Sequence, residues 1–213
     1  MRTKKLLVLV LFLLLAGGLI SCNSDKTEIE AVRLHSNSYL IVSKNEFSQQ
    51  IGDLLTIYFP DDLEQPPLGS LAKISLEPEI RASYPPQADA KSVKIVDEKA
   101  SVLTDPNVAE RIAWHLGENA YLIDVRSESE YVEGHLSGAI LMPSEDFAER
   151  LPAEIPDRET VILLYCRTGN RSSAALKQAQ DLGYIVAINA GGVVDYEGEL
   201  VTGSEPGPRP GAE

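Results

Sequence analysis

A cysteine followed by an arginine-containing loop is the part of this 213-residue sequence best suited to chemistry. Cys166 ends the apolar run "TVILLYC", and "RTGNRS" follows it, with Arg167 and Arg171 in the loop and a hydroxyl at Ser172. If a strand ends at the cysteine and a helix begins at the hydroxyl, backbone N–H groups point at the sulfur. Their partial positive charge lowers the pKa of the thiol and stabilises a bound anion. The pattern therefore predicts a nucleophilic thiolate in an anion-binding loop, with an inert buried thiol as the alternative.

The two arginines stand out from an acidic background. Residues 105–213 carry 19 acidic but only 8 basic side chains, and two of those 8 flank the thiol. The whole chain has a formal net charge of −13. Nucleic acid is therefore not expected as a partner, because a phosphate backbone requires a basic surface. We interpret the acidic balance as favouring solubility and the arginines as part of a site.

The segments that must position the loop alternate as in a parallel α/β domain. Asp105 followed by Pro106 predicts the start of a helix, and Gly183 can end the helix over "SSAALKQAQDLG". Apolar runs short enough for buried parallel strands lie at residues 92–96, 120–125, 138–143, 160–166 and 184–190. The cysteine thus follows a predicted buried strand.

Two separated motifs resemble the rhodanese-type sulfurtransferases. "YCRTGNRS" is similar to the active-site loop of that family, and "LIDVRSESEYVEGHLSGAILMP" at 122–143 is similar to its upstream signature. The resemblance spans roughly residues 95–200. It implies a doubly wound parallel α/β sheet with helices on both faces, and it leaves the region 23–90 uncovered.

The resemblance also implies a ping-pong transfer of sulfane sulfur. Cys166 would take the outer sulfur of a small anion such as thiosulfate as a persulfide, and a thiol or cyanide would accept it. Backbone N–H groups of the implied substrate-binding loop would hold the anionic sulfur. That loop consists of Arg167, Thr168, Gly169, Asn170 and Arg171, and the implied supporting residues are Asp124 and Arg126. Neither a metal nor an organic cofactor is implied.

Loop length separates this interpretation from its enzymatic alternative. From Cys166 to Arg171 there are six residues, whereas the related dual-specificity phosphatases and arsenate reductases have one more, which forms a wider cradle for a tetrahedral oxyanion. The shorter loop favours sulfur over a phosphatase or arsenate reductase-like activity. Another alternative is a non-catalytic rhodanese-like interaction module of the envelope, although such modules often lack the cysteine. A further alternative is that the main function lies in the N-terminal extension, which would bind an envelope partner, and that the enzymatic domain is merely attached to it.

Charged residues of the upstream motif also have structural interpretations. Arg126 with Glu130 or Glu133 could form a scaffold ion pair, and we give this at least as much weight as a catalytic role. His135 invites a general-base interpretation, but we assign it a structural role because a lone histidine in a turn is more often a hydrogen-bonding residue.

The remaining aromatic and imidazole side chains add little evidence about the function. Tyr196 stands where the family commonly has tryptophan after two glycines, which bears on the rim of the donor pocket. Trp114 is expected in the core. His35 and His115 belong to no ligand motif, so no metal site is predicted.

The N-terminus has the features of an export signal. Basic residues precede the apolar run 6–20, which is short for a membrane span, and "LISC" then resembles a bacterial lipobox. We expect a lipoprotein signal peptide at 1–21 and an acylated Cys22 that anchors the chain to a membrane of the bacterial cell envelope. An uncleaved signal anchor is the alternative.

Composition divides the rest of the chain. We predict an acylated tether at 22–38, an irregular N-terminal extension of unknown role at 39–90, where "PDDLEQPP" and "YPP" argue for loops, and the rhodanese-like domain at 91–203. The proline- and glycine-rich segment 204–213 is predicted to be disordered.

The lipobox gives a direct test. Replacing Cys22→Ser removes the only sulfur that the predicted lipidation can use, so metabolic labelling with a radioactive or clickable fatty acid should fall to background. Cys166→Ser serves as the control and should label normally. Unchanged labelling of the Cys22→Ser chain would overturn the assignment.

Overall fold

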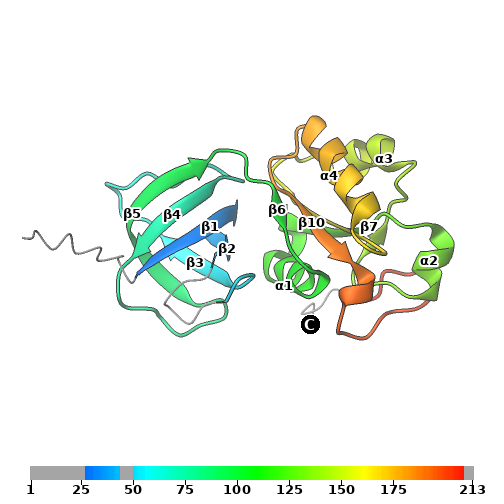
Figure 1. The fold of residues 1–213 in the computed structure, drawn as a ribbon, viewed down its shortest axis with the longest axis horizontal. Coiled ribbons are helices and arrows are strands. Elements are labelled where there is room, and N and C mark those ends of the chain that lie inside the picture. Colours follow the sequence, from blue (N-terminus) through cyan, green and yellow to red (C-terminus); the bar gives the residue numbers. More distant parts are fainter. Residues whose placement is uncertain (1–26, 44–49, 209–213) are drawn as a thin grey trace, which may run out of the picture.

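The structure, a computed structural model, describes residues 27–43 and 50–208. These residues form an N-terminal β-barrel and a C-terminal α/β unit that lie side by side (Figure 1). The predicted signal peptide 1–21 and the lipidation site Cys22 lie outside the described residues. Within the described part of the chain, no helix combines the length and the apolar character that crossing a membrane requires.

Five strands close the N-terminal barrel in the order β1-β2-β3-β5-β4. Strands β3 and β5 pair in parallel and the other neighbours pair antiparallel, which is the connectivity of an OB-fold. Alternate side chains point inward, as the two-residue period of a strand requires, and fill an apolar interior. The strands are β1 (Glu28–His35), β2 (Ser38–Ile41), β3 (Leu54–Tyr58), β4 (Leu71–Leu76) and β5 (Gln87–Asp97).

The barrel corrects three sequence predictions. Residues 28–35 form a strand rather than part of a tether at 22–38, and the region 39–90 is not irregular. The segment 92–96, expected as the first strand of the rhodanese-like domain, is the second half of β5, so the predicted boundary at 91 is wrong. The prolines that suggested loops do lie in loops, but these loops connect strands whose short alternating patterns were too weak to recognise individually.

The C-terminal unit is a five-stranded parallel sheet in the order β6-β10-β9-β7-β8. Its strands are β6 (Val102–Leu103), β7 (Ala120–Asp124), β8 (Ile140–Leu141), β9 (Val161–Cys166) and β10 (Ala187–Gly192). Its helices are α1 (Pro106–Leu116), α2 (Glu128–Glu133), α3 (Phe147–Glu154) and α4 (Asn170–Asp181), with short 3₁₀ turns at Gly117–Asn119 and Val193–Asp195. The predicted α/β fold is confirmed.

Helices cover both faces of this sheet. Leu163 of the central strand β9 packs in one apolar cluster with Ile112 of α1, whereas Leu164 packs in another with residues of α3 and α4. Every residue of β9 is buried because both of its faces are covered. The start of α1 also follows the prediction, since the Asp105 carboxylate accepts hydrogen bonds from the N–H groups of Asn107 and Val108.

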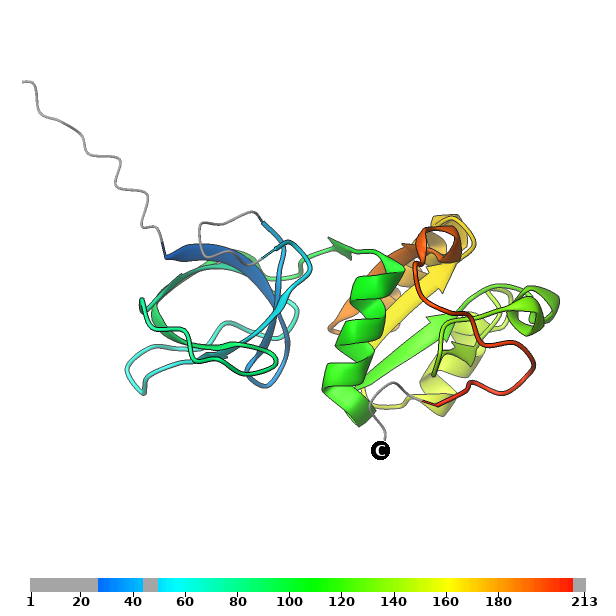
Figure 2. The ribbon, with the colours of Figure 1, turned by 90° about the horizontal axis from the view of Figure 1, so that it is seen from below.

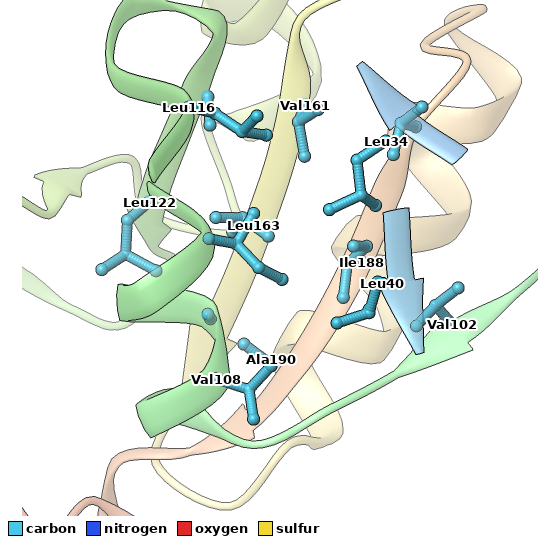
Figure 3. Packing of buried hydrophobic residues seen from close by; sticks show 14 of the residues in the cluster. Leu34, Leu40, Val102, Val108, Leu116, Leu122, Val161, Leu163, Ile188 and Ala190 are labelled. Atoms are coloured by element: carbon cyan, nitrogen blue, oxygen red, sulfur yellow. The ribbon is translucent and has the colours of Figure 1, made fainter. Parts of the chain in front are cut away.

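The barrel packs on the face of the sheet that α1 covers (Figure 2). Leu34 and Leu40 of the barrel enter the same apolar cluster as Val102 and Ile188 of the sheet (Figure 3). At the rim, the Ser38 hydroxyl lies 3.1 Å from His115 Nε2. The two units therefore share one hydrophobic cluster, in addition to the separate apolar interior of the barrel.

Part of the predicted disordered segment 204–213 is ordered. Gly138 N–H donates to Pro206 O at 2.7 Å, and the Ser137 hydroxyl donates to Pro208 O at 2.6 Å. A proline lacks an N–H group but keeps its carbonyl acceptor, so a proline-rich segment can still be fixed by donors from the domain. Residues 209–213 lie outside the described part of the chain.

The shared core predicts a stability effect at the interface. Leu40→Ala should lower the free energy of unfolding by about 2–5 kcal/mol, because Leu40 is only 1% exposed and its loss leaves a cavity between the two units. Urea unfolding followed by Trp114 fluorescence and by circular dichroism should show one transition. Leu103→Ala, at a leucine that is 73% exposed, is the control and should change stability by less than about 0.5 kcal/mol. Two separate transitions would contradict a shared core.

Candidate active site

Cys166 lies at the carboxyl end of β9, where the chain turns through a short loop into α4. Gly169 N–H donates a hydrogen bond to Cys166 Sγ at 3.1 Å, and the Ser172 hydroxyl lies 3.7 Å from the same sulfur. The thiol is buried, with 1% of the residue exposed. The predicted strand and loop are present and bring hydrogen-bond donors to the sulfur. The helix begins at Asn170 rather than at Ser172, so Asn170 and Arg171 belong to the first turn of α4.

The surroundings of the thiol favour the thiolate. Burial raises the pKa of the Cys166 thiol because it disfavours the charged form. Hydrogen bonds from the N–H and hydroxyl of Ser172 and from the N–H groups of Thr168 and Gly169 lower the pKa by more. The pKa of the thiol therefore lies below its ordinary value, as a nucleophilic cysteine requires.

Two glycines allow the loop to close over the sulfur. Gly169 has a φ of +92°, in the left-handed region that favours glycine. Gly192 has an ordinary φ, but a Cβ added there would lie 2.5 Å from Arg167 O and 2.6 Å from Thr168 Cα. The end of β10 therefore presses directly against the backbone of the loop, which a larger residue would prevent.

The two loop arginines differ in their placement. Arg171 forms a bidentate ion pair with Glu130 of α2, at 2.6 Å from Nη1 to Oε2 and 2.7 Å from Nη2 to Oε1. The Arg171 guanidinium, together with the Ser127 capping interactions and against the opposing effect of burial, lowers the pKa of Glu130 to about 2. Arg167 is exposed, and its backbone carbonyl accepts a hydrogen bond from Val194 N–H at 3.4 Å. Glu130 is therefore a partner of the loop that the sequence did not identify.

Asp124 and Arg126 form a buried ion pair of their own. Arg126 Nη2 donates to Asp124 Oδ2 at 2.7 Å and to Gly134 O at 2.6 Å. The expected pairing of Arg126 with Glu130 or Glu133 is wrong, because Asp124 lies closer on the same turn and Glu130 is taken by the loop arginine. The guanidinium lies 5.8 Å from the ring of the tyrosine that precedes the cysteine. The pair thus contacts the scaffold of the loop.

The structural role assigned to His135 is confirmed. Its ring is buried and stacks on the ring of Tyr131, with 3.6 Å between the ring centroids and 5° between the ring planes. Its Nδ1 lies 2.9 Å from Tyr131 O, and its Nε2 lies 3.0 Å from Glu205 O. In residues 27–43 and 50–208, no group of three or more histidine, cysteine, aspartate or glutamate side chains could hold a metal ion.

Two aromatic side chains, Tyr196 and Trp114, have different surroundings in the structure. Tyr196 is part-buried against the core on the α1 side, and its hydroxyl donates to Glu110 Oε1 at 2.7 Å, so it fixes the segment after β10 to α1. The core placement expected for Trp114 is wrong. It is 43% exposed and packs against Tyr84 of the barrel, with ring centroids 5.2 Å apart. Periodicity within α1 could not reveal a partner that comes from the barrel.

A buried amide near the cysteine was also missed. Asn189 of β10 is 7% exposed and accepts a hydrogen bond from the Ser172 hydroxyl at 2.7 Å. A polar residue within the apolar stretch "YIVAINA" was the available signal, because a buried amide requires partners.

The α/β unit is similar to known proteins. The family model described as "Rhodanese-like domain" matches residues 108–199. The thiosulfate sulfurtransferase PspE of Escherichia coli (strain K12) is 35% identical over 81 residues, which are 38% of this chain and 78% of that protein. The putative sulfurtransferase YtwF of Bacillus subtilis (strain 168) is 34% identical over 82 residues, which are 38% of this chain and 78% of that protein. A solved structure of an E. coli rhodanese matches with 33% identity, a TM-score of 0.38, and coverage of 39% of this chain and 99% of that one.

The fold, the cysteine loop and the sequence relatives together define the class. The chain belongs to the rhodanese family. It is a sulfurtransferase of the rhodanese type, joined to an N-terminal barrel that lies outside the family match.

The Glu130 to Arg171 pair makes stability depend on pH. The contribution of this pair to the free energy of unfolding is fully present above the ordinary carboxyl pKa of 4.5. It is lost as the pH falls through the folded-state pKa of Glu130, which is about 2. Between these values, wild type should lose about 1 kcal/mol more of its free energy of unfolding than Glu130→Gln, a modest amount because the pair is part-exposed. Urea denaturation at several pH values measures the difference. Glu128→Gln, on the same helix, is the control, and parallel curves for Glu130→Gln and wild type would contradict the prediction.

Proposed function

We propose that the chain transfers sulfane sulfur from thiosulfate or a similar anion to a thiophilic acceptor through a persulfide on Cys166. The observation that carries this proposal is the hydrogen bond from Gly169 N–H to Sγ in a loop that lowers the pKa of the thiol. A thiolate is the reactive form of cysteine, and the backbone N–H groups of the loop together with the Ser172 hydroxyl stabilise it.

The first half-reaction is a displacement at sulfur. The Cys166 thiolate attacks the outer sulfur of thiosulfate, a new S–S bond forms, and the S–S bond of the donor breaks with its electron pair leaving on sulfite. The enzyme then carries a persulfide with one negative charge on the outer sulfur. In the second half-reaction, cyanide or a thiolate attacks that outer sulfur and the Cys166 thiolate is regenerated.

Backbone N–H groups are the principal electrostatic support in this proposal. Arg171 is paired with Glu130 through both terminal nitrogens and also interacts with Cys166, but the hydrogen bonds from the backbone and from Ser172 act more strongly on the thiol. The N–H groups of the loop and of the first turn of α4 carry partial positive charge that no side chain neutralises. The Asp124 to Arg126 pair would act indirectly, by fixing the end of β7 beside β9.

Two alternatives remain to be separated from sulfur transfer. The six-residue span from Cys166 to Arg171 disfavours a phosphatase or arsenate reductase-like activity, because the related enzymes with those activities have a loop that is one residue longer. The intact cysteine loop disfavours a purely non-catalytic module. We further propose, from the lipobox alone, that the enzyme works in the cell envelope on a lipid anchor.

Intact-mass spectrometry tests the proposed reaction. The chain without its signal peptide and with Cys22→Ser, reduced and then incubated with thiosulfate, should gain the mass of one sulfur atom and lose it again on addition of cyanide. Cys166→Ser in the same background should gain nothing. An unchanged mass, or hydrolysis of p-nitrophenyl phosphate that depends on Cys166, would count against the proposal.

A further inference from the structure

Asn189 is a buried amide in a strand that is otherwise apolar up to its terminal glycines. It belongs to "AINAGG" of β10, and 7% of it is exposed. Burial of an amide is costly unless its donors and acceptors are paired, so its partners are informative.

The amide connects three segments around the thiol. Asn189 Oδ1 accepts hydrogen bonds from the Ser172 hydroxyl at 2.7 Å and from Gly191 N–H at 3.0 Å. Asn189 Nδ2 donates to Gly169 O at 3.3 Å. One side chain therefore links the start of α4, the glycine pair that ends β10, and the carbonyl of Gly169, the residue whose N–H donates to the sulfur.

The Ser172 hydroxyl has one proton and several acceptors. Its oxygen lies 2.7 Å from Asn189 Oδ1, 3.0 Å from Gly169 O and 3.7 Å from Cys166 Sγ. At these distances the amide oxygen is the preferred acceptor while the sulfur is neutral. A negative sulfur becomes the stronger acceptor, and the proton can reach it by rotation about the Cβ–Oγ bond alone.

We propose that Asn189 is a positioning residue for Cys166: by holding the Gly169 carbonyl it fixes the conformation of Gly169, whose N–H points at the sulfur, and it holds the Ser172 hydroxyl ready to turn to the thiolate. The role in turnover rests on the proposed sulfur transfer. When the persulfide forms, the negative charge moves to the outer sulfur, Sγ becomes neutral, and the hydroxyl returns to Asn189 Oδ1. The amide thus gives the hydroxyl a second acceptor in the states where the inner sulfur is uncharged.

The pH dependence of Cys166 alkylation by iodoacetamide tests this role without requiring turnover. Asn189→Leu keeps the volume of the side chain but removes both hydrogen-bonding groups, so Gly169 N–H should be held less firmly and the pKa of the thiol should rise. Alkylation near neutral pH should slow about fivefold to tenfold, which corresponds to a shift approaching one pKa unit. At high pH, where the thiol is fully ionised, the rate should stay within about twofold of wild type.

Control variants separate positioning from general disruption. Asn107→Leu removes an amide that bonds Asp195 O and Glu197 N–H away from the thiol, and its alkylation profile should match wild type. Asn189→Asp is isosteric and guards against misfolding of the leucine variant. It removes the donor to Gly169 O and adds negative charge, so it should also slow alkylation near neutral pH. In the Ser172→Ala background, the effect of Asn189→Leu should be smaller, because both side chains act in one network.

Several outcomes would overturn the proposal. If folded Asn189→Leu and Asn189→Asp both give profiles that superimpose on wild type, the amide does not position the thiol. If alkylation slows by the same factor at every pH, the substitution only limits access to the sulfur. Failure of wild type to form a persulfide would reject the proposed function while leaving the alkylation result for Asn189 interpretable.

Discussion

The close approach of two backbone segments underlies the site. The end of β10 lies so near the loop after β9 that a Cβ at Gly192 would meet the backbone of Arg167 and Thr168. With that approach, the loop can curl over Cys166 and direct the Gly169 N–H at its sulfur. The pairing of β9 with β10 in the parallel sheet brings the two segments to the same edge. The electrostatic environment of the thiol thus depends on main-chain packing more than on charged side chains.

The ion pairs around the loop serve this geometry. Arg171 and Glu130 join the start of α4 to α2, and Arg126 and Asp124 hold the turn after β7. Each guanidinium is matched by a carboxylate, which fixes its position, and Arg171 also interacts with Cys166. Burial makes such pairing necessary for Arg126, because an unpaired charge with so little access to water would be strongly destabilising.

The barrel changes how the α/β unit is stabilised. One face of the sheet is covered by α3 and α4, whereas the other is covered by α1 together with Leu34 and Leu40 of the barrel. The N-terminal region is therefore part of the core that supports β9 and β10, not an appendage. The family model matches residues 108–199, within the α/β unit, and the barrel lies outside that match.

The sequence by itself determined the α/β unit and the cysteine loop. Buried parallel strands are continuous apolar runs, and the loop has a fixed local order of cysteine, glycine and hydroxyl, so both can be recognised from neighbouring residues. The barrel escaped recognition because its short strands acquire their order only through pairing, including the parallel contact of β3 with β5 across about 30 residues of chain. Tertiary structure alone decided that Glu130 pairs with Arg171, that Trp114 meets Tyr84, and that Asn189 reaches Ser172. These partners are far apart in the chain, and residue types do not specify which distant side chains folding will bring within hydrogen-bonding or packing distance.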